Sequence, residues 1–336
     1  MRRKCGVAFL LLGLVIATGC ASDGPADSKD SFKVGMVFDV GGKGDKSFND
    51  SAYRGMLNAA DDYGVEFTEF EPGQDADREV GLRKLAQADY DMVIGVGFLF
   101  SDAIKKVAID FPGTKFACVD YDMRPGEELP PNLLGLRFRE EEGSFLVGIL
   151  AAMHTQTDRI GFVGGMDIPL IHKFEAGYIA GARHANPGVS VTVAYAGTTP
   201  QAFADPAKGK ELALLQYGRG VDVIYHASGS TGNGVIEAAR EARAYAIGVD
   251  SNQNYMAPGH VLTSMIKRVD NAVYVAIEEA LEGTFRGGVQ ELGLAEDGVG
   301  YAVDQHNENL ITEEMTEAVE SARAAIIAGD VEVPRS

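Results

Sequence analysis

The sequence predicts an α/β protein with two lobes, each built around a parallel β-sheet. Short apolar runs alternate with helical patterns from residue 34 almost to the C-terminus. Strands separated by helices indicate right-handed βαβ units and therefore parallel sheets. The runs number eleven, more than one doubly wound sheet normally holds, and a chain of 336 residues exceeds what one core usually supports. We therefore expect two similar lobes.

The expected elements follow from these patterns. The candidate strands are 34–38, 66–70, 92–96, 115–119, 134–137, 159–163, 190–195, 221–226, 245–249, 261–266 and 300–303. The candidate helices are 48–63, 77–87, 102–111, 140–155, 170–186, 206–217, 232–243, 268–282 and 312–328.

The two halves of the chain resemble each other, because each begins with an apolar strand that runs into a glycine-rich turn and a helix. The spacing predicts that the chain leaves the first lobe near Arg137, returns near Ile266 and crosses a third time near Asp304. We expect an N-terminal lobe of residues 32–138 plus about 265–303. The C-terminal lobe would then contain about 139–264 plus 304–330, and three crossings would form the hinge.

The first 31 residues predict an export signal and a tether. Three basic residues precede an apolar stretch over 6–16, which is too short to span a bilayer. Residues 17–19 are small and precede Cys20, a pattern that resembles a bacterial lipobox, although Ala17 replaces the more usual Leu. We expect 1–19 to be a signal peptide, Cys20 to be lipidated and 20–31 to be a flexible tether. An ordinary signal peptide with an incidental cysteine is the alternative.

Charge and cysteine content exclude several classes of protein. Without the leader, 27 of the 30 basic residues remain against 49 acidic ones, a net charge of −22. This excess opposes nucleic-acid binding, which needs Lys and Arg to neutralise phosphates. Cys118 is the one cysteine left after lipidation, so no disulfide framework or thiolate metal site is expected. No phosphate loop, zinc-binding pair or nucleophile elbow occurs, so we expect neither an enzyme nor a cofactor.

Residues 33–50 combine the features of a binding site at the end of a strand. An apolar strand ends at Asp39, a glycine-rich turn follows, and a helical pattern begins near Ser47. Ser47 and Asp50 have the spacing of a capping box. Phe48 and Asn49 would then lie in the first helical turn, near the edge where open α/β sheets bind ligands. An aromatic face beside an amide and a carboxylate suits a flat polar ring.

Several other strands end on groups that could contact a ligand. These groups are Asp39, Asp120, Gly229, Asp250 and Lys267. A single strand-end aspartate is often only a turn residue or a helix cap. Five such endings on strands from both halves favour one shared cleft between the lobes.

Phe48 and Phe174 hold equivalent positions after the first strand of each half. A phenylalanine at a helix start is usually a core residue, but two in matching places suggest a pair that sandwiches a planar ring. Asp250 and Lys267 could bind vicinal hydroxyls through charge-assisted hydrogen bonds. A hinge salt bridge is the alternative for Lys267, and a satisfied core position is the alternative for His226.

Taken together, these segments resemble the basic membrane protein family of bacterial lipoproteins, also called the purine nucleoside receptor A-like family. The resemblance covers about residues 32–330. The carrying segments are GMVFDVGGKGDKSFND, VIGVGF, FACVDYD, EEGSFLVG, IGFVGGMDIPLIHKFEAGYIAGA, IYHASGSTGNGV, IGVDSNQ and LTSMIKRVDNAVY. It implies the type I periplasmic-binding-protein fold, in which two Rossmann-like lobes close on a ligand in the cleft between them. It also implies a monomeric receptor, anchored outside the cytoplasm through lipid, that hands nucleosides to an ABC-type permease and its ATPase.

The resemblance also implies roles for the site residues. Phe48 and Phe174 would stack on a purine base, with Asn49, Asp39 and Asp120 at its polar edge. Gly229 would contact the ribose through its backbone, together with Asp250 and Lys267. The pair His172-Lys173 departs from the family pattern, in which two basic residues are more usual at these positions. A receptor for a small sugar, a sensor that signals to a membrane partner and a nucleoside-cleaving enzyme are the alternatives.

Overall fold

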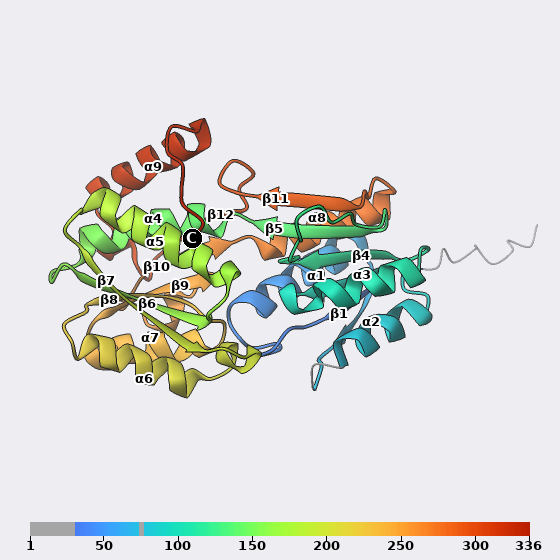
Figure 1. Cartoon of the computed structure of the whole chain (residues 1–336), viewed down its shortest axis with the longest axis horizontal. Helices are drawn as coiled ribbons and strands as arrows, with labels where there is room; N and C mark the ends of the chain where they lie inside the picture. Colours follow the sequence, from blue (N-terminus) through green and yellow to red (C-terminus); the bar gives the residue numbers. More distant parts are fainter. Residues whose placement is uncertain (1–30, 74–76) are drawn as a thin grey trace, which may run out of the picture. The chain divides into compact units, whose positions relative to one another are not determined.

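The computed structural model describes residues 31–73 and 77–336, and these residues form the two expected lobes (Figure 1). Each lobe contains a six-stranded sheet with helices on both faces. The predicted signal peptide and lipidated Cys20 lie outside the described residues. Within the described part of the chain, no helix combines the length and the apolar character that crossing a bilayer requires.

The N-terminal lobe has the strand order β11-β5-β4-β3-β1-β2, and all neighbours are parallel. Its strands are β1 (Lys33–Val37), β2 (Glu66–Phe70), β3 (Met92–Val96), β4 (Lys115–Val119), β5 (Leu133–Phe138) and β11 (Gly288–Leu292). Its helices are α1 (Phe48–Tyr63), α2 (Asp77–Gln87), α3 (Ser101–Asp110) and α8 (Val269–Glu282). Helices α1 and α8 pack together on one face of the sheet, and α2 and α3 pack together on the other.

The C-terminal lobe has the strand order β12-β10-β9-β8-β6-β7, in which β12 alone is antiparallel to its neighbour. Its strands are β6 (Arg159–Met166), β7 (Ser190–Gly197), β8 (Val223–Ala227), β9 (Tyr245–Asp250), β10 (Val261–Lys267) and β12 (Val299–Tyr301). Its helices are α4 (Glu140–His154), α5 (Pro169–Ala185), α6 (Pro206–Tyr217), α7 (Thr231–Ala242) and α9 (Glu313–Ala328). The described residues also form four short 3₁₀ helices, at Phe98–Phe100 in the N-terminal lobe and at Pro200–Phe203, Asn254–Met256 and Glu308–Leu310 later in the chain.

Alternating side chains explain why the central strands are apolar throughout. In β1, Val34 and Met36 pack under α1 and α8, whereas Val37 packs under α2 and α3. Successive side chains of a strand point to opposite faces, so a sheet with helices on both faces buries every position. The same alternation holds in β8, where Tyr225 faces the α4 side and Ile224 faces the α6 and α7 side.

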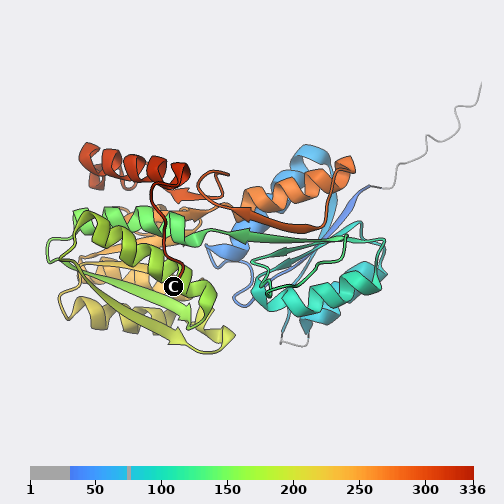
Figure 2. The ribbon, with the colours of Figure 1, turned by 45° about the horizontal axis from the view of Figure 1, so that its top comes forward.

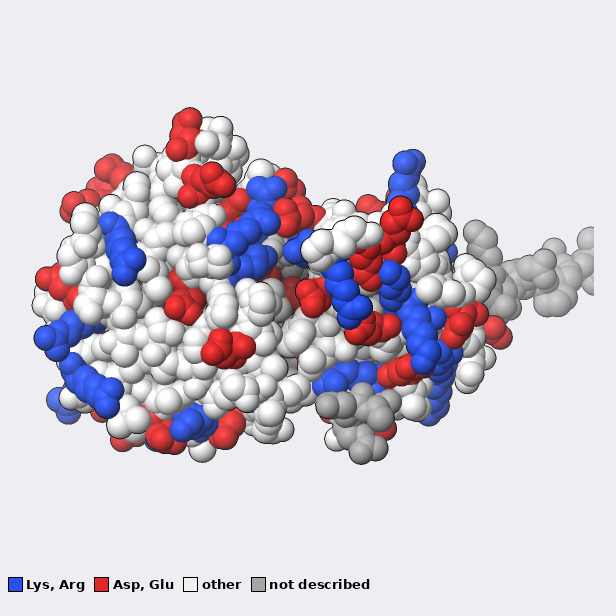
Figure 3. Space-filling model, viewed as in Figure 1, with Lys and Arg blue, Asp and Glu red and all other residues white. Residues whose placement is uncertain are grey.

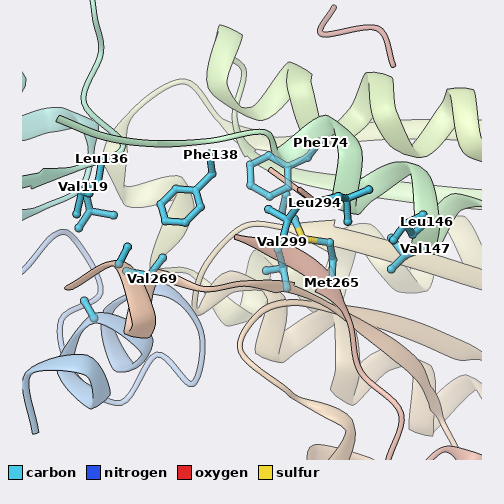
Figure 4. Close-up of a cluster of buried hydrophobic side chains, with 14 of the residues drawn as sticks. Val119, Leu136, Phe138, Leu146, Val147, Phe174, Met265, Val269, Leu294 and Val299 are labelled. Atoms are coloured by element: carbon cyan, nitrogen blue, oxygen red, sulfur yellow. The ribbon is translucent and has the colours of Figure 1, made fainter. Parts of the chain in front are cut away.

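The chain passes between the lobes three times, and Figure 2 shows these connecting segments in green, orange and red-orange. The crossings join β5 to α4, β10 to α8 and β11 to β12. Apolar side chains from all of these segments meet at the hinge, including Phe138, Met265, Val269, Leu294 and Val299 (Figure 4). The apolar core of the hinge is therefore continuous with the cores of both lobes.

The third crossing differs from our expectation. We placed 299–303 in the N-terminal lobe, but β12 pairs with β10 in the C-terminal sheet. The crossing thus falls at 293–298 and not near Asp304. Its predecessor β11 was not expected, because GVQEL has little apolar content and most of its side chains are at least partly exposed.

Candidate ligand-binding site between the two lobes

A cavity lies where the carboxyl ends of the two sheets face each other. The space between its lining atoms is about 550 Å³, part of which is open to solvent. All eight residues that the sequence singled out line it: Asp39, Phe48, Asn49, Asp120, Phe174, Gly229, Asp250 and Lys267. The structure thus brings together groups that are up to 228 residues apart in the chain.

The two expected aromatic side chains come from opposite lobes. Phe48 begins α1 and is half-buried, and Phe174 lies in the second turn of α5 and is 3% exposed. The Nζ atom of Lys267 lies 5.2 Å from the Phe48 ring centroid and 5.6 Å from that of Phe174. Both rings therefore face the same ammonium group in a shared cavity.

Sequence reasoning missed two further aromatic residues of the cavity, Phe98 and Phe203. Their rings form an edge-to-face pair across the lobes, with centroids 6.5 Å apart. Phe98 follows β3 at the same sheet edge as the residues after β1 and β4, so its position after a strand was a usable signal. Phe203 belongs to a 3₁₀ turn in a loop, and no periodic pattern marks it.

Two of the strand-end aspartates have an unusual backbone conformation. Asp120 has φ 58° and Asp250 has φ 62°, in the left-handed region that most residues avoid. Each follows or ends the central strand of its sheet, β4 or β9. Such strain persists only where the surrounding structure enforces it, and it is common at binding sites. Both side chains line the cavity.

Burial changes the protonation of the cavity carboxylates. Desolvation raises the pKa of Asp39 to about 7, although Arg78 lies 3.7 Å away and opposes this shift. Desolvation also raises the pKa of Asp250 to about 7, with Lys267 and Ser47 opposing it. Near neutral pH these two groups can therefore act either as hydrogen-bond donors or as acceptors.

Lys267 is buried and paired in the ligand-free structure. Its Nζ lies 2.6 Å from Asp120 Oδ1 and 3.0 Å from Glu140 Oε1. Burial alone would lower the pKa of Lys267, but the carboxylates of Asp120, Glu140 and Asp250 outweigh burial and raise it. The salt bridge that we considered as an alternative role for Lys267 is therefore present, and it joins the end of β10 to the end of β4.

The start of α1 is capped differently from our expectation. Ser47 makes no capping hydrogen bond with its side chain. Asp45 takes this role, since its carboxylate accepts from the backbone N–H groups of Ser47 (2.9 Å), Asn49 (2.8 Å) and Asp50 (3.1 Å). A buried carboxylate at a helix N-terminus is favourable for the helix dipole as well. The capping box predicted for Ser47 and Asp50 is wrong.

The Ser47 hydroxyl instead connects the lobes. Its Oγ donates to Asp250 Oδ2 at 2.5 Å and lies 3.2 Å from the carbonyl oxygen of Val249. Ser251 Oγ donates to the carbonyl of Ser47 at 2.9 Å, and Gln253 Nε2 donates to the carbonyl of Lys46 at 3.1 Å. The loop before α1 is thus bonded directly to the end of β9.

Two other polar residues serve the framework of the site. Asn49 Oδ1 accepts from the backbone N–H of Asp39, and its Nδ2 donates to Asp45, both at 3.0 Å. His226 is fully buried and lies 3.0 Å from Gln253 Oε1, and burial lowers its pKa to about 4. His226 therefore occupies a satisfied core position, the alternative that we considered for it.

The fold and the cavity define a class of protein. Two lobes with parallel sheets, joined by a three-segment hinge around a small-molecule cavity, are the architecture of solute-binding proteins. The described residues contain no group of three or more His, Cys, Asp or Glu side chains that could hold a metal ion.

Comparison with known proteins identifies the family. Residues 32–336 match the Bmp family, described as "ABC transporter substrate-binding protein PnrA-like", and the chain belongs to this family. An uncharacterized lipoprotein of Pyrococcus abyssi is 37% identical and covers 89% of this chain and 77% of its own length. Basic membrane protein A of Borreliella burgdorferi is 34% identical and covers 97% of this chain and 94% of its own length.

A solved structure confirms the fold. The ABC transporter system solute-binding protein of Aeropyrum pernix K1 superposes with a TM-score of 0.82 at 32% identity, covering 91% of this chain and 94% of its own. The protein is therefore the substrate-binding component of an ABC transporter and not an enzyme. The predicted type I periplasmic-binding-protein fold and the predicted family are both confirmed.

Proposed function

We propose that this protein captures a purine nucleoside and delivers it to its membrane permease. The base would stack between Phe48 and Phe174, with Asn49, Asp39 and Asp120 at its polar edge. The ribose would contact Asp250, Lys267 and the backbone of Gly229. We further propose that lipid on Cys20 holds the monomeric protein at the outer side of the cell membrane.

The observation that carries the proposal is the pairing of aromatic faces from opposite lobes with buried carboxylates in one cavity. Phe48 and Phe174 line the cavity from α1 and α5, and four aspartates line it as well. Flat apolar faces favour a planar ring through stacking. Carboxylates accept hydrogen bonds from ring N–H groups, exocyclic amines and sugar hydroxyls. A nucleoside carries all of these groups on one small uncharged molecule.

The charge of the cavity supports an uncharged ligand. Among the residues that the structure describes, its lining contains Asp39, Asp45, Asp120 and Asp250 but a single cation, Lys267, which is already paired. An anionic phosphate placed there would meet more carboxylates than cations in a region of low dielectric constant, where repulsion is strong. Nucleosides therefore fit this cavity better than nucleotides.

The ion pairs of Lys267 restrict how it can contact a ribose. An ammonium group has three N–H donors, and Asp120 and Glu140 take up two directions. The remaining donor can serve one hydroxyl without breaking either ion pair. Asp250, whose pKa is about 7, can supply the second contact as acceptor or donor.

A receptor for a small sugar remains the second candidate. Aromatic side chains and carboxylates also bind sugars, and a pyranose ring can stack on a phenyl face. Aromatic rings that line the cavity from both lobes favour the purine, since a flat base presents two π faces and a sugar does not.

Calorimetric titration with adenosine, guanosine, inosine and ribose tests the proposal. We expect binding heat from at least one nucleoside and none from ribose, because stacking contributes most of the apolar contact. Phe174→Leu, which keeps an apolar side chain but removes the π face, should weaken nucleoside binding by about tenfold, or ~1.4 kcal/mol. Phe162→Leu is the control, because Phe162 is buried in the same lobe but does not line the cavity.

Ribose or another simple sugar binding as tightly as any nucleoside would overturn the purine assignment in favour of the sugar receptor. Unchanged nucleoside affinity in Phe174→Leu would remove this ring from the ligand contact. Loss of affinity in Phe162→Leu alone would point to indirect effects of core packing.

A further inference from the structure

Glu140 is a fully buried carboxylate that pairs with Lys267 of the binding cavity. It is the first residue of α4, directly after the first hinge crossing, and its relative exposure is 0%. It is absent from the cavity lining, which includes Lys267 and Asp120. Its Oε1 lies 3.0 Å from Lys267 Nζ, and Glu140 lines a neighbouring pocket that shares Phe98, Asp120 and Leu170 with the cavity.

The surroundings of Glu140 contain a set of four charges that compensate each other, beside a separate pair of Glu141 and Arg335. Lys267 pairs with both Asp120 and Glu140, and Glu140 pairs in turn with Lys173 of α5. Burial would raise the pKa of Glu140, but the two lysines outweigh burial and lower it, so it is ionised at neutral pH. The set contains two carboxylates and two ammonium groups, and none of the four side chains is more than 13% exposed.

Lys267 is also held in place by its apolar neighbours. Its Nζ lies between the rings of Phe48, Phe138 and Phe174, at 4.9 to 5.6 Å from their centroids. Two of these rings, Phe138 and Phe174, appear in the hinge core of Figure 4. The rings enclose the ammonium group and hold its position. A change in its ion pairs therefore mainly alters the net charge that a ligand meets, and has less effect on where the group lies.

We propose that Glu140 is a specificity-determining residue, which neutralises Lys267 together with Asp120 and so makes the cavity select uncharged ligands over phosphorylated ones. This inference rests on the proposed nucleoside function and assigns the rejection of charged relatives to one residue outside the cavity. Removing the Glu140 charge leaves Asp120, Lys267 and Lys173 with a net charge of +1. A buried uncompensated cation attracts an anion strongly, because little solvent screens it.

The test compares Glu140→Gln with Glu141→Gln. Both residues are buried carboxylates in the first turn of α4 and both lie near Lys173, but Glu141 pairs with Arg335 and not with Lys267. Calorimetry measures the dissociation constants of adenosine and of adenosine 5′-monophosphate (AMP) for each protein. We expect Glu140→Gln to lower the ratio of the AMP constant to the adenosine constant by about tenfold or more, and Glu141→Gln to leave this ratio unchanged.

A second variant should change the ratio of the AMP constant to the adenosine constant in the opposite direction. Lys173→Met removes one cation from the same set and leaves Glu140 to Lys267 alone, so the ratio should rise. Lys173 is partly exposed, so this variant tests the idea even where Glu140→Gln fails to fold. A purely structural role of Glu140 would lower the thermal midpoint and weaken both ligands equally, without changing the ratio.

The outcomes separate this inference from the proposed function. Wild-type protein that binds no nucleoside would overturn both. Wild-type protein that binds adenosine and rejects AMP, together with an unchanged ratio in Glu140→Gln and in Lys173→Met, would overturn the role of Glu140 and leave the proposed function standing.

Discussion

Asp250 occupies a position that lowers the stability of the folded protein. Its backbone has a positive φ, its carboxylate is buried, and burial raises its pKa to about 7. The folded protein therefore binds a proton at pH values where the unfolded chain has already released it. This side chain is best explained by the ligand that we expect it to contact.

Asp250→Asn should stabilise the ligand-free protein above neutral pH. An aspartate whose pKa is raised in the folded state costs nothing below about pH 4, where both states are protonated. Its destabilising free energy grows as the pH rises toward 7 and is constant above pH 7. Asn adopts the left-handed conformation readily and can still accept from Ser47. We expect the free energy of unfolding at pH 8 to rise by roughly 2 to 4 kcal/mol, measured by urea denaturation.

The pH dependence of this gain distinguishes the mechanism from a general effect. The advantage of Asp250→Asn over wild type should shrink toward zero near pH 4. Asp304→Asn is the control of opposite sign, because hydrogen bonds outweigh burial there and lower the pKa of Asp304. A gain in Asp250→Asn that is the same at pH 4 and pH 8 would show that its ionisation is not the cause.

At this scale the sequence predicted which residues meet, but not how they are bonded. The order of strands and the chemistry of the residues after them were enough to select eight residues of the cavity. The capping of α1 by Asp45 was missed, since Ser47, Asp45 and Asp50 all fit a cap by type. Only the position of Asp250 in the other lobe, 203 residues away, explains why Ser47 is used differently.

Helices α4 and α5 carry Glu140 and Phe174, and glycines set the distance between them. A Cβ atom at Gly181 would overlap the carbonyl oxygen of Phe145, and one at Gly177 would overlap that of Glu141. On the other helix, a Cβ atom at Gly148 would overlap the carbonyl oxygen of Tyr178. Direct contact of the two backbones fixes the Glu140–Lys173 ion pair and the direction of the Phe174 ring.

Gly181→Ala should therefore destabilise the protein, even though Ala favours a helix by about 1 kcal/mol over Gly. The added methyl group must push the helices apart in a close-packed core, which typically costs 1 to 3 kcal/mol. We expect a net loss of roughly 1 to 2 kcal/mol in urea denaturation, together with weaker ligand binding. Gly113→Ala is the control, because a Cβ atom there meets nothing within 4 Å. Equal stability of the two variants would contradict this account of the α4–α5 contact.

The bounds of a helix or strand could be predicted where its own residues carry a local hydrophobic pattern. Helix α1 was expected at 48–63 and is found at Phe48–Tyr63, since its apolar spacing and the glycine after it are local signals. Strand β11 was not predictable in this way. Its place at the edge of the sheet comes from pairing with β5, and an edge strand needs few apolar residues.

On the scale of the whole binding domain, the two lobes are bonded to each other without a ligand. The loop at 45–47 contacts Asp250, Ser251 and Gln253, and Lys267 contacts Asp120. The surface carries charges of both signs, and on the face shown in Figure 3 acidic and basic side chains are interspersed. Specific buried polar contacts therefore stabilise the closed arrangement of the two lobes, and the binding energy of a ligand would add to them.

Ser47→Ala should shift the ligand-free protein toward a more open arrangement. The substitution removes the hydrogen bond that Ser47 donates across the lobes to the Asp250 carboxylate, while leaving the backbone cap from Asp45 intact. We expect a larger radius of gyration without ligand by small-angle X-ray scattering, an unchanged value at saturating nucleoside, and about tenfold weaker binding. Ser51→Ala is the control, because Ser51 contacts Asp270 within the N-terminal lobe. An unchanged radius of gyration in Ser47→Ala would show that this serine does not hold the lobes together.

The three hinge crossings have a practical consequence for dissecting the molecule. Strand β11 and helix α8 complete the first lobe, but both follow most of the second lobe in the chain. A gene fragment that stops before Glu140 would lack an edge strand and one covering helix, leaving apolar surface of β4 and α1 uncovered. Each half of this protein must therefore be studied with the other attached, or through a circularly permuted gene that rejoins its separated pieces.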